Sequence, residues 1–588
     1  MPFDDSASDA DDAEPRLNGH AHARYDGEDT SATTQRELYG WYAYPIAAEV
    51  FAVVAVGAFL PVVLEQLARE NGFFFSDRSR PCVEPGRARI RDAGESSAVN
   101  EGEQCMVRFL GRDMSTSSFA MYSFSAAVMV QAVTLVCLSS FADHGPYRKK
   151  MLMIFAYVGS TVSALFIFIS PATYYLAPIL VILGVASLGC SFVLLNAFLP
   201  LLVANHPDNL HAKTFTSDSS SDDVELEALN PDNAAHPIHR SDPDKLSRDL
   251  ERSAQISSRG VGYGYISAVF VQIISIVILY LFSKTEIQKR NPSLSIRVIL
   301  FLVGIWWAAC SIPTLLWLRP RPGPPLPSLN DGTFPSQKPS RLRTFTFYTK
   351  FSLSSFWRTL RRAIRLRQTL IFLISWFLLS DAVATISGTA VLFARTELHM
   401  GTIAIAMLSI TSIGSGIVGA FAWPHVQRRL SLEPKTVLLC CVGGMEFIPL
   451  YGLLGYIPVI QKLGFIGLQK AWEIYPIAVI HGIVMGGISS YARSVYAPLI
   501  PEGSEAAFFA LYAVTDKGSS AFGPAFVGWL VDRAGTIRPA FIFLAILVVL
   551  PAPLLWLLNV EKGREDARAM AEGDEGGRAT YERVNRED

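Results

Sequence analysis

FAMYSFSAAVMVQAVTLVCLSS at residues 119–140 and MLMIFAYVGSTVSALFIFIS at residues 151–170 are two apolar stretches without a single charged side chain. A helix needs about 20 apolar residues to cross the hydrocarbon of a bilayer, where its backbone groups must hydrogen-bond to one another. Both stretches have that length, and the segment between them, FADHGPYRKK, carries three Lys or Arg side chains. This region therefore predicts two membrane-spanning helices joined by a short basic loop.

Similar apolar stretches recur along all 588 residues, of which 50% are apolar and 18% charged. An ordinary soluble chain carries about 25% charged residues. We expect an all-α membrane protein with twelve transmembrane helices; eleven is the alternative count, because several spans contain ionisable residues. The predicted spans are 43–64, 119–140, 151–170, 174–203, 261–282, 298–318, 368–394, 402–423, 436–460, 474–496, 506–531 and 538–559.

Several classes of function are not indicated. The net charge of −1 gives no overall field that would attract nucleic acid. The chain has no G-x-x-x-x-G-K-[ST] sequence for ATP, and its histidines and cysteines do not have the spacing of a metal site. We therefore expect a protein that is not an enzyme and that needs no cofactor, metal or nucleic-acid partner.

The basic residues predict the orientation. Cytosolic loops of membrane proteins carry an excess of Lys and Arg. If the N-terminus is cytosolic, the loops at 141–150, 319–367 and 424–435 carry 17 such residues, and the short loops on the other side carry 8. We therefore expect both termini in the cytosol. The predicted organisation is a disordered N-terminus at 1–37, four helices at 38–203 with a lumenal loop at 65–118, a disordered loop at 204–258, two helices at 259–318, a basic linker at 319–367, six helices at 368–560 and a tail at 561–588.

The basic linker contains its own helical pattern. Leu353, Trp357, Leu360 and Ile364 recur at helical spacing among several arginines. Such a helix would lie on the membrane surface, with its arginines near anionic headgroups. A plain connector between two halves of the protein is the alternative.

The linker separates six spans from six, and the two sets resemble each other. Glu49 in the first span is followed sixteen residues later by Glu65, as Asp381 in the seventh is followed by Glu397. FADHGPYRKK after the second span corresponds to FAWPHVQRRL after the eighth. Two parallel six-helix halves are the arrangement of the major facilitator transporters.

Four further segments narrow the resemblance. They are GWYAYPIAAEVF at 40–51, TSSFAMYSFS at 116–125, SSRGVGYGY at 257–265 and APLIPEGSEAAFFALYAVTDKGSSAFGP at 497–524. Together they resemble the autophagy-related protein 22 family. The resemblance implies a multi-pass protein of the fungal vacuolar membrane, of the major facilitator type, that exports amino acids released by autophagic degradation. Its partners would be small-molecule amino acids and the lipid bilayer.

The 141–150 loop also resembles the Gly/Ala-Asp-x-x-Gly-Arg-Lys signature of major facilitator proteins. The matching residues are Ala142, Asp143, Gly145, Arg148 and Lys149, and the second copy lacks the acid and the glycine. Asp143 and Arg148 are therefore candidates for gating.

Charged residues inside the membrane cost about 2.5–3.5 kcal/mol each on insertion scales, so each needs a reason. Glu49 and Asp381 lie on the first helix of each half, and this helix lines the central cavity of the major facilitator fold. A carboxylate there could carry a proton, which would give proton coupling, or meet a substrate ammonium group. The alternative is a structural acid bonded to a neighbouring helix.

The remaining candidates are polar residues in the tenth and eleventh spans and at helix ends. His481 is a candidate for proton coupling or a satisfied core histidine. Asp516 and Lys517 are adjacent and need separate partners, and Lys517 could meet a substrate carboxylate. Arg259 and Arg493 lie near cytosolic helix ends and are candidates for gating, with snorkelling as the alternative.

The cysteines support the placement of the first loop. Cys82 and Cys105 both lie in the 65–118 loop, and lumenal proteins pass through an oxidising compartment. We predict a disulfide between them, worth about 3 kcal/mol in the chain-entropy view; two free thiols are the alternative.

Three functions remain open from the sequence. The first is a secondary transporter that moves amino acids from the vacuole to the cytosol. The second is a transporter of another small solute, such as a sugar or a drug. The third is a non-transporting receptor or scaffold on the same fold. The intramembrane acids favour transport.

Overall fold

The structure is a computed structural model. It describes residues 29–74, 80–82, 105–109, 111–207, 243–286, 291–324, 341–398, 400, 402–464, 466–519, 523, 526–527, 530 and 538–572. The predicted N-terminal segment before residue 29, most of the 204–258 loop and the tail beyond residue 572 lie outside the described residues.

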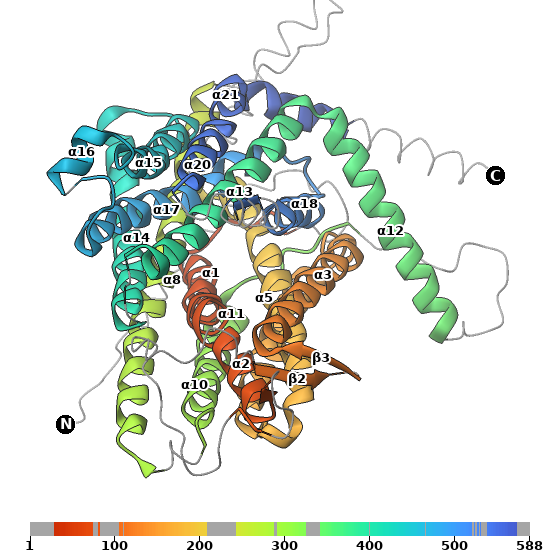
Figure 1. Ribbon diagram of the computed structural model, residues 1–588. Coiled ribbons are helices and arrows are strands. Elements are labelled where there is room, and N and C mark those ends of the chain that lie inside the picture. Colours follow the sequence, from red (N-terminus) through yellow and green to blue (C-terminus); the bar gives the residue numbers. More distant parts are fainter. Residues whose placement is uncertain are drawn as a thin grey trace, which may run out of the picture.

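The two predicted halves lie largely in separate parts of the molecule in Figure 1, with α1, α2 and α10 in the lower part, α13, α15, α20 and α21 in the upper part, and α8 running from one part into the other. The first half consists of α1 (Gln35–Val50), the π-helix η1 (Phe51–Phe59), α2 (Leu60–Glu70), α3 (Thr116–Ala142), α4 (Tyr147–Leu165), η2 (Phe166–Phe168), η3 (Pro171–Leu176), α5 (Ala177–Asn196), α6 (Leu199–Ala204), α8 (Pro243–Ser283), α10 (Leu294–Cys310) and α11 (Ile312–Trp317).

The second half follows the linker helix α12 (Arg341–Arg365). It consists of α13 (Arg367–Thr396), α14 (Thr402–Leu430), α15 (Pro434–Leu454), α16 (Pro458–Leu463), η4 (Ala471–Glu473), α17 (Ile474–Tyr496), η5 (Ala497–Leu499), α18 (Glu505–Ser519), α20 (Ala540–Val549) and α21 (Pro551–Leu557). Residues 560–572 form a further helix at the end of the described chain.

Among the described residues, ten helical segments are long and apolar enough to cross a membrane. Each overlaps one of the twelve predicted spans. The predicted second span lies in α3, whose shorter apolar stretch is Tyr122–Leu135. The predicted eleventh span begins in α18 and continues into residues that are only partly described. Twelve therefore remains the predicted number, and the helices follow the predicted order.

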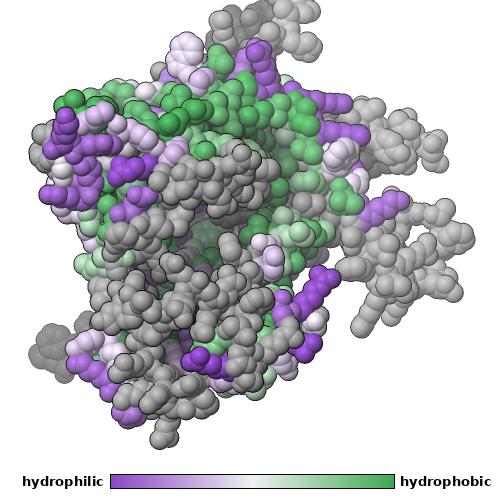
Figure 2. All heavy atoms as spheres, viewed as in Figure 1, coloured by the Kyte–Doolittle hydropathy of each residue, from purple (hydrophilic) through white to green (hydrophobic). Residues whose placement is uncertain are grey.

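Apolar side chains cover much of the upper body in Figure 2, and hydrophilic ones gather at its margins. Many large apolar residues are exposed on these helices; Met129, Ile305 and Val418, for example, are 70%, 49% and 58% exposed. A helix face of this kind suits contact with lipid, where apolar side chains need no cover from protein. The surface is hollowed between the two halves in this view.

Each half has its own core. In the first half, fully buried Trp41 of α1 donates from its indole nitrogen to the Leu195 carbonyl of α5 at 3.1 Å. In the second half, aromatic rings stack between α13 and α18, with Trp376 and Tyr512 centroids 4.6 Å apart. Glycines let α14 and α17 pack unusually closely, since a Cβ at Gly419 would lie 2.2 Å from the Ile483 carbonyl oxygen.

The 65–118 loop differs from its prediction in two ways. The first span continues as α2 to Glu70, where Glu65 and Arg69 form an ion pair of 2.7 Å on the exposed helix surface. The loop also contains a small antiparallel sheet, in the order β1 (Phe73–Phe74), β2 (Cys105–Phe109) and β3 (Arg112–Ser115). The loop sequence is too polar to build a core of its own. The sheet instead packs on α2 and α3, and Val107 is fully buried there.

Cys82 and Cys105, the predicted pair, are joined by a disulfide with their Cα atoms 6.0 Å apart. The bond ties the start of β2 to the segment after β1, where the Cys82 backbone N–H donates to the Gly72 carbonyl at 2.9 Å.

Helix α12 extends away from the body on the right of Figure 1. It packs on both α3 and α18, so it joins the two halves. Leu353, Trp357 and Ile364 on its outer face are 60%, 54% and 54% exposed. Leu360 instead packs against the core. Placement on the membrane surface stays a prediction, which these exposed apolar residues favour.

Candidate functional site

The two halves meet along a seam. Helix α8 of the first half packs on α14 and α17, and α3 and α5 pack on α18. The approach is close where α8 crosses α14, because a Cβ at Gly262 would lie 2.5 Å from the Phe421 ring. Polar residues gather at two places along this seam, which we call the end lock and the seam cluster, and at a third place within the first half, which we call the Arg321 cluster.

The end lock joins the loop after α3 to the start of α18. Asp143 accepts hydrogen bonds from the backbone N–H groups of Ala506 and Ala507 at 2.7 and 2.9 Å. Arg148 lies 3.2 Å from the Asp143 carboxylate and 3.1 Å from that of Glu505. The first-turn N–H groups of a helix have no partners within it, so Asp143 caps α18 from the opposite half.

The end lock is almost dry, with Asp143 and Arg148 each 3% exposed. Burial raises the pKa of the Asp143 carboxyl to about 7. Arg148 and the two backbone N–H groups act against this shift, and the negative charge of Glu505 adds to it. Two carboxylates therefore share one arginine at this place.

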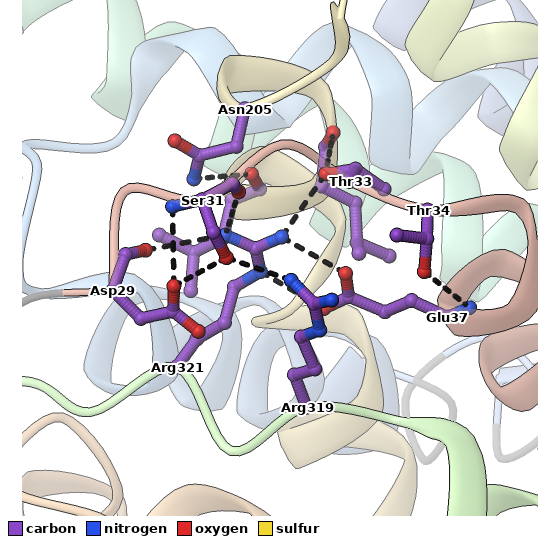
Figure 3. Close-up of polar contacts among 10 residues, drawn as sticks. Asp29, Ser31, Thr33, Thr34, Glu37, Asn205, Arg319 and Arg321 are labelled. Atoms are coloured by element: carbon purple, nitrogen blue, oxygen red, sulfur yellow. Dashed lines mark hydrogen bonds and ion pairs between the residues drawn. The ribbon is translucent and has the colours of Figure 1, made fainter. Parts of the chain in front are cut away.

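The Arg321 cluster lies beside the end lock and was not predicted. Figure 3 shows Arg321 at its centre, surrounded by the segment before α1 and the end of α6. Arg321 donates to both oxygens of Glu37 at 2.9 Å, and the two side chains are 3% and 0% exposed. It also reaches the Thr33 hydroxyl at 3.2 Å, and the Thr33 N–H donates to the Asn205 carbonyl at 2.8 Å. Two residues further along, the Gly323 N–H donates to Gly145 in the loop of the end lock at 3.0 Å.

These contacts close one end of the molecule. They hold together the segment before α1, the 143–148 loop, the start of the linker and the start of α18. We call this the closed end. The sheet β1–β3 follows α2, whose chain has crossed the bundle from α1, so it lies at the opposite end.

The seam cluster contains Glu49, the first of the predicted membrane carboxylates. Arg493 of α17 donates to the Asn196 side chain of α5 at 2.9 Å, which joins the two halves. Tyr265 of α8 lies 3.3 Å from the Ser489 hydroxyl of α17, which again crosses the seam. Glu49 of α1 is close enough to interact electrostatically with both Arg493 and Tyr265.

The backbone also singles out Glu49. It is the last residue but one of α1, separated from the π-helix η1 by Val50 alone, and π-helical turns are frequent at functional sites. Its methylene groups pack on Gly264 of α8, whose Cβ would lie 3.1 Å from the Glu49 Cβ. The chain thus leaves room for a large side chain between α1 and α8.

Asp381, the counterpart of Glu49, has a different environment. It is 5% exposed and accepts the backbone N–H of Gly523 at 3.0 Å, within its own half. Neighbouring Ser380 donates to the Asp516 carboxylate at 2.6 Å. This geometry favours the structural alternative for Asp381. The side chain of Lys517 lies outside the described part of the structure.

The other predicted candidates lie apart from the seam cluster. His481 of α17 has Ser412 3.0 Å from Nδ1 and Ser387 3.2 Å from Nε2, so both ring nitrogens have partners within the second half. Arg259 is exposed on α8 and lies against Tyr42. Among the described residues, no group of three or more His, Cys, Asp or Glu side chains could hold a metal.

Sequence reasoning missed Asn196, Tyr265, Glu505 and the Arg321–Glu37 pair. Asn196 carried a usable signal, because it is the one amide in the apolar stretch SFVLLNAFLP. Glu37 and Arg321 had no such signal in the sequence, since each lies in a polar segment at the edge of a span where charges are common.

The arrangement can bind a small charged solute. A carboxylate from one half and a guanidinium from the other face the same seam, with a phenol and hydroxyls beside them. The groups of the seam cluster could neutralise opposite charges on one molecule.

The solved structures similar to this chain are membrane transporters. One is the major facilitator transporter FucP in the outward conformation (TM-score 0.52, 12% identity, 89% of this chain and 100% of that chain). Another is a bacterial homologue of the iron transporter ferroportin in an outward-facing state with soaked iron (TM-score 0.51, 11% identity, 89% and 98%). At this identity the likeness shows the fold alone, which is of the predicted major facilitator type.

Sequence comparison gives closer relatives. The chain is 76% identical over 564 residues to Autophagy-related protein 22-1 of Phaeosphaeria nodorum, covering 96% of this chain and 97% of the relative. It is 50% identical to Autophagy-related protein 22-1 of Sclerotinia sclerotiorum, covering 93% of each. Residues 33–568 match the profile of the family described as "Vacuole effluxer Atg22 like". The chain therefore belongs to the Atg22-like family of vacuole effluxers.

Proposed function

We propose that the chain is a secondary transporter of the vacuolar membrane that releases amino acids into the cytosol, with the seam cluster as its substrate site. One observation carries the proposal. Glu49 of the first half and Arg493 of the second half interact across the seam, beside polar groups of both halves. A zwitterionic amino acid has an ammonium group for the carboxylate and a carboxylate for the guanidinium.

The position of these groups supports transport by alternating access. In this fold the halves rock against each other around a fixed site near the middle of the membrane. A solute that bridges Glu49 and Arg493 would contact both halves at once, so its binding would depend on how the halves are placed. The end lock, whose contacts cross from one half to the other, would have to open before the solute could leave through the closed end.

The charge count supports the orientation of the protein in the membrane. It places the 141–150 and 319–367 loops in the cytosol, and both meet at the closed end. The structure would then be the state that is sealed toward the cytosol and loaded from the vacuolar lumen. Placement of the termini in the cytosol is part of the same proposal.

The test uses full-length protein reconstituted into liposomes and preloaded with unlabelled leucine, with labelled leucine outside. We expect saturable counterflow that falls by more than about tenfold in Glu49→Gln, because loss of a charged partner costs about 1.5–3 kcal/mol. Ser257→Ala, a buried change on α8 whose hydroxyl has no partner in the described structure, is the matched control. A set of the twenty amino acids and two sugars, each with and without a pH gradient, gives the substrate class and the proton coupling. Normal counterflow in Glu49→Gln would remove the seam cluster as the site.

A further inference from the structure

A cavity lies at the closed end, outside the seam cluster. It has a volume of about 120 Å³. Its walls come from α6 and α8 of the first half, from η5 of the second half and from the helix at 560–572. Val203, Leu250 and Ile500 supply an apolar floor, and all three are less than 9% exposed.

Two polar groups in this cavity have unused hydrogen-bonding capacity. Arg564 uses Nη2 to pair with Asp249 at 3.2 Å, but its buried Nη1 has no hydrogen-bond partner in the described structure. The Ser253 hydroxyl is also buried without a partner there, and this residue is 4% exposed. Buried donors without partners are rare, because each forfeits about 1–3 kcal/mol of solvation. Two of them line this one cavity, Ser253 from α8 and Arg564 from the helix at 560–572, and they point to a bound acceptor such as a carboxylate.

The charges around the cavity balance. Arg564 and Arg568 face Asp249 and Glu502, and the guanidinium of Arg564 interacts electrostatically with all three of the others. The two arginines would attract a bare anion, and the two carboxylates would repel it. A ligand with an ammonium beside its carboxylate meets opposite charges at both ends, and an apolar side chain would rest on the floor.

The helix at 560–572 makes the site a bridge between the halves. It is seated on the second half at Gly563, where a Cβ would lie 2.3 Å from Leu499 and 2.9 Å from Gln368. Gln368 also accepts the Asn559 N–H at 3.0 Å. The next residue, Arg564, reaches Asp249 of the first half. A ligand held by Arg564 and Ser253 therefore contacts elements of both halves in the closed state.

We infer that this cavity is a second ligand site, which takes a small zwitterion with an apolar side chain, of the class of neutral α-amino acids, and holds the closed end shut. That the ligand is also the transported product rests on the proposed function. The site then gives feedback, since amino acid on the closed-end side would slow further release.

The test measures binding rather than transport, in full-length protein in lipid nanodiscs, with labelled leucine as the probe. Glu49→Gln is the background, since it removes the seam cluster. We expect one saturable leucine site to remain there. We expect at least a fivefold loss of affinity on adding Ser253→Ala or Arg564→Lys, and no change on adding Ser257→Ala. Ser257 is a buried α8 serine, also without a partner in the described residues, that does not line the cavity.

Two analogues test the zwitterion. 4-Methylpentanoate lacks the ammonium and 3-methylbutylamine lacks the carboxylate; each should compete at least tenfold less well than leucine. Equal competition by either analogue would overturn the ligand class. Absence of leucine binding in Glu49→Gln, or binding that survives both Ser253→Ala and Arg564→Lys in folded protein, would overturn the site. If wild-type protein does not transport but this binding persists, the proposed function fails and the second site stands.

Discussion

Glu49 and Asp381 occupy matching positions in the two halves, and each packs against a glycine, but with different atoms. A Cβ at Gly264 would meet the Cβ and Cγ of Glu49, and the Glu49 carboxylate interacts electrostatically with Arg493 and Tyr265 of the seam. Gly523 donates its N–H to the Asp381 carboxylate itself. One acid faces the partner half, and the other is engaged within its own half.

The two acids show that matching positions of a repeated fold can have different roles, one in transport and one in stability. Contacts that cross the seam must break when the halves rock, so they should set transport and the balance between conformations. Contacts within one half move as a rigid unit and should mainly set stability. The side chain one methylene longer, Glu49, is the one that reaches the seam.

The largest expected effect separates the two acids by charge. Glu49→Gln should reduce leucine counterflow by more than about tenfold, since a neutral amide loses the charged interaction across the seam. Asp381→Asn should retain most of the transport, because an amide oxygen can still accept the Gly523 N–H. Counterflow and thermal unfolding are measured on the same preparations. Equal losses in the two variants would show that repeat symmetry extends to function.

The second prediction concerns the Asp381 carboxylate as the hydrogen-bond acceptor of the Gly523 N–H. Asp381→Ala leaves the buried Gly523 N–H without a partner and should destabilise the protein by about 1–3 kcal/mol. Asp381→Asn should cost much less. The melting temperature in detergent reports the difference, with Glu49→Ala as the control at the matching seam position. A larger loss in Glu49→Ala than in Asp381→Ala would reverse the comparison.

The third prediction uses the end lock, whose contacts also cross the seam. In the closed state the pKa of Asp143 is raised to about 7, and on opening the carboxyl regains water and its ordinary value near 3.8. Closing therefore takes up a proton, so the closed state should be favoured at low pH and weaken as pH rises toward 7. The change is about tenfold per pH unit at most, and it levels off above pH 7.

This dependence can be followed by spin labels placed across the closed end between pH 5 and pH 8. Asp143→Asn should flatten the profile, since it removes the titrating group while keeping an oxygen for the N-terminus of α18. Asp381→Asn should leave the profile unchanged. A profile that rises with pH would contradict the assignment of the proton to Asp143.

The sequence predicted the order of the helices and the two halves because span length and the Glu49–Asp381 repeat are local patterns. It also selected Asp143 and Arg148 as gating candidates, because both belong to the signature in the 141–150 loop. It did not predict Glu505 as the third partner, because that contact joins residues 357 positions apart. Nor could the pattern distinguish the roles of Glu49 and Asp381, since the distinction depends on which atoms of Gly264 and Gly523 approach them. Arg321 was likewise invisible, because its partner Glu37 looks like any charged residue before a span.

The smallest expected effect tests a contact within the second half. Ser412 of α14 and Ser387 of α13 satisfy the two nitrogens of His481. Ser412→Ala removes one of these bonds and should cost about 0.6 kcal/mol, the average for polar contacts between membrane helices. Because α13, α14 and α17 move together, counterflow per folded molecule and the spin-label distances should stay at wild-type values. Asn196→Ala is the matched change across the seam, because Asn196 binds Arg493 through a single side-chain bond of 2.9 Å. It should alter counterflow and conformational balance with a similarly small effect on melting. If Ser412→Ala instead abolishes transport at normal stability, His481 is part of the transport site, and the division between seam contacts and contacts within one half does not hold.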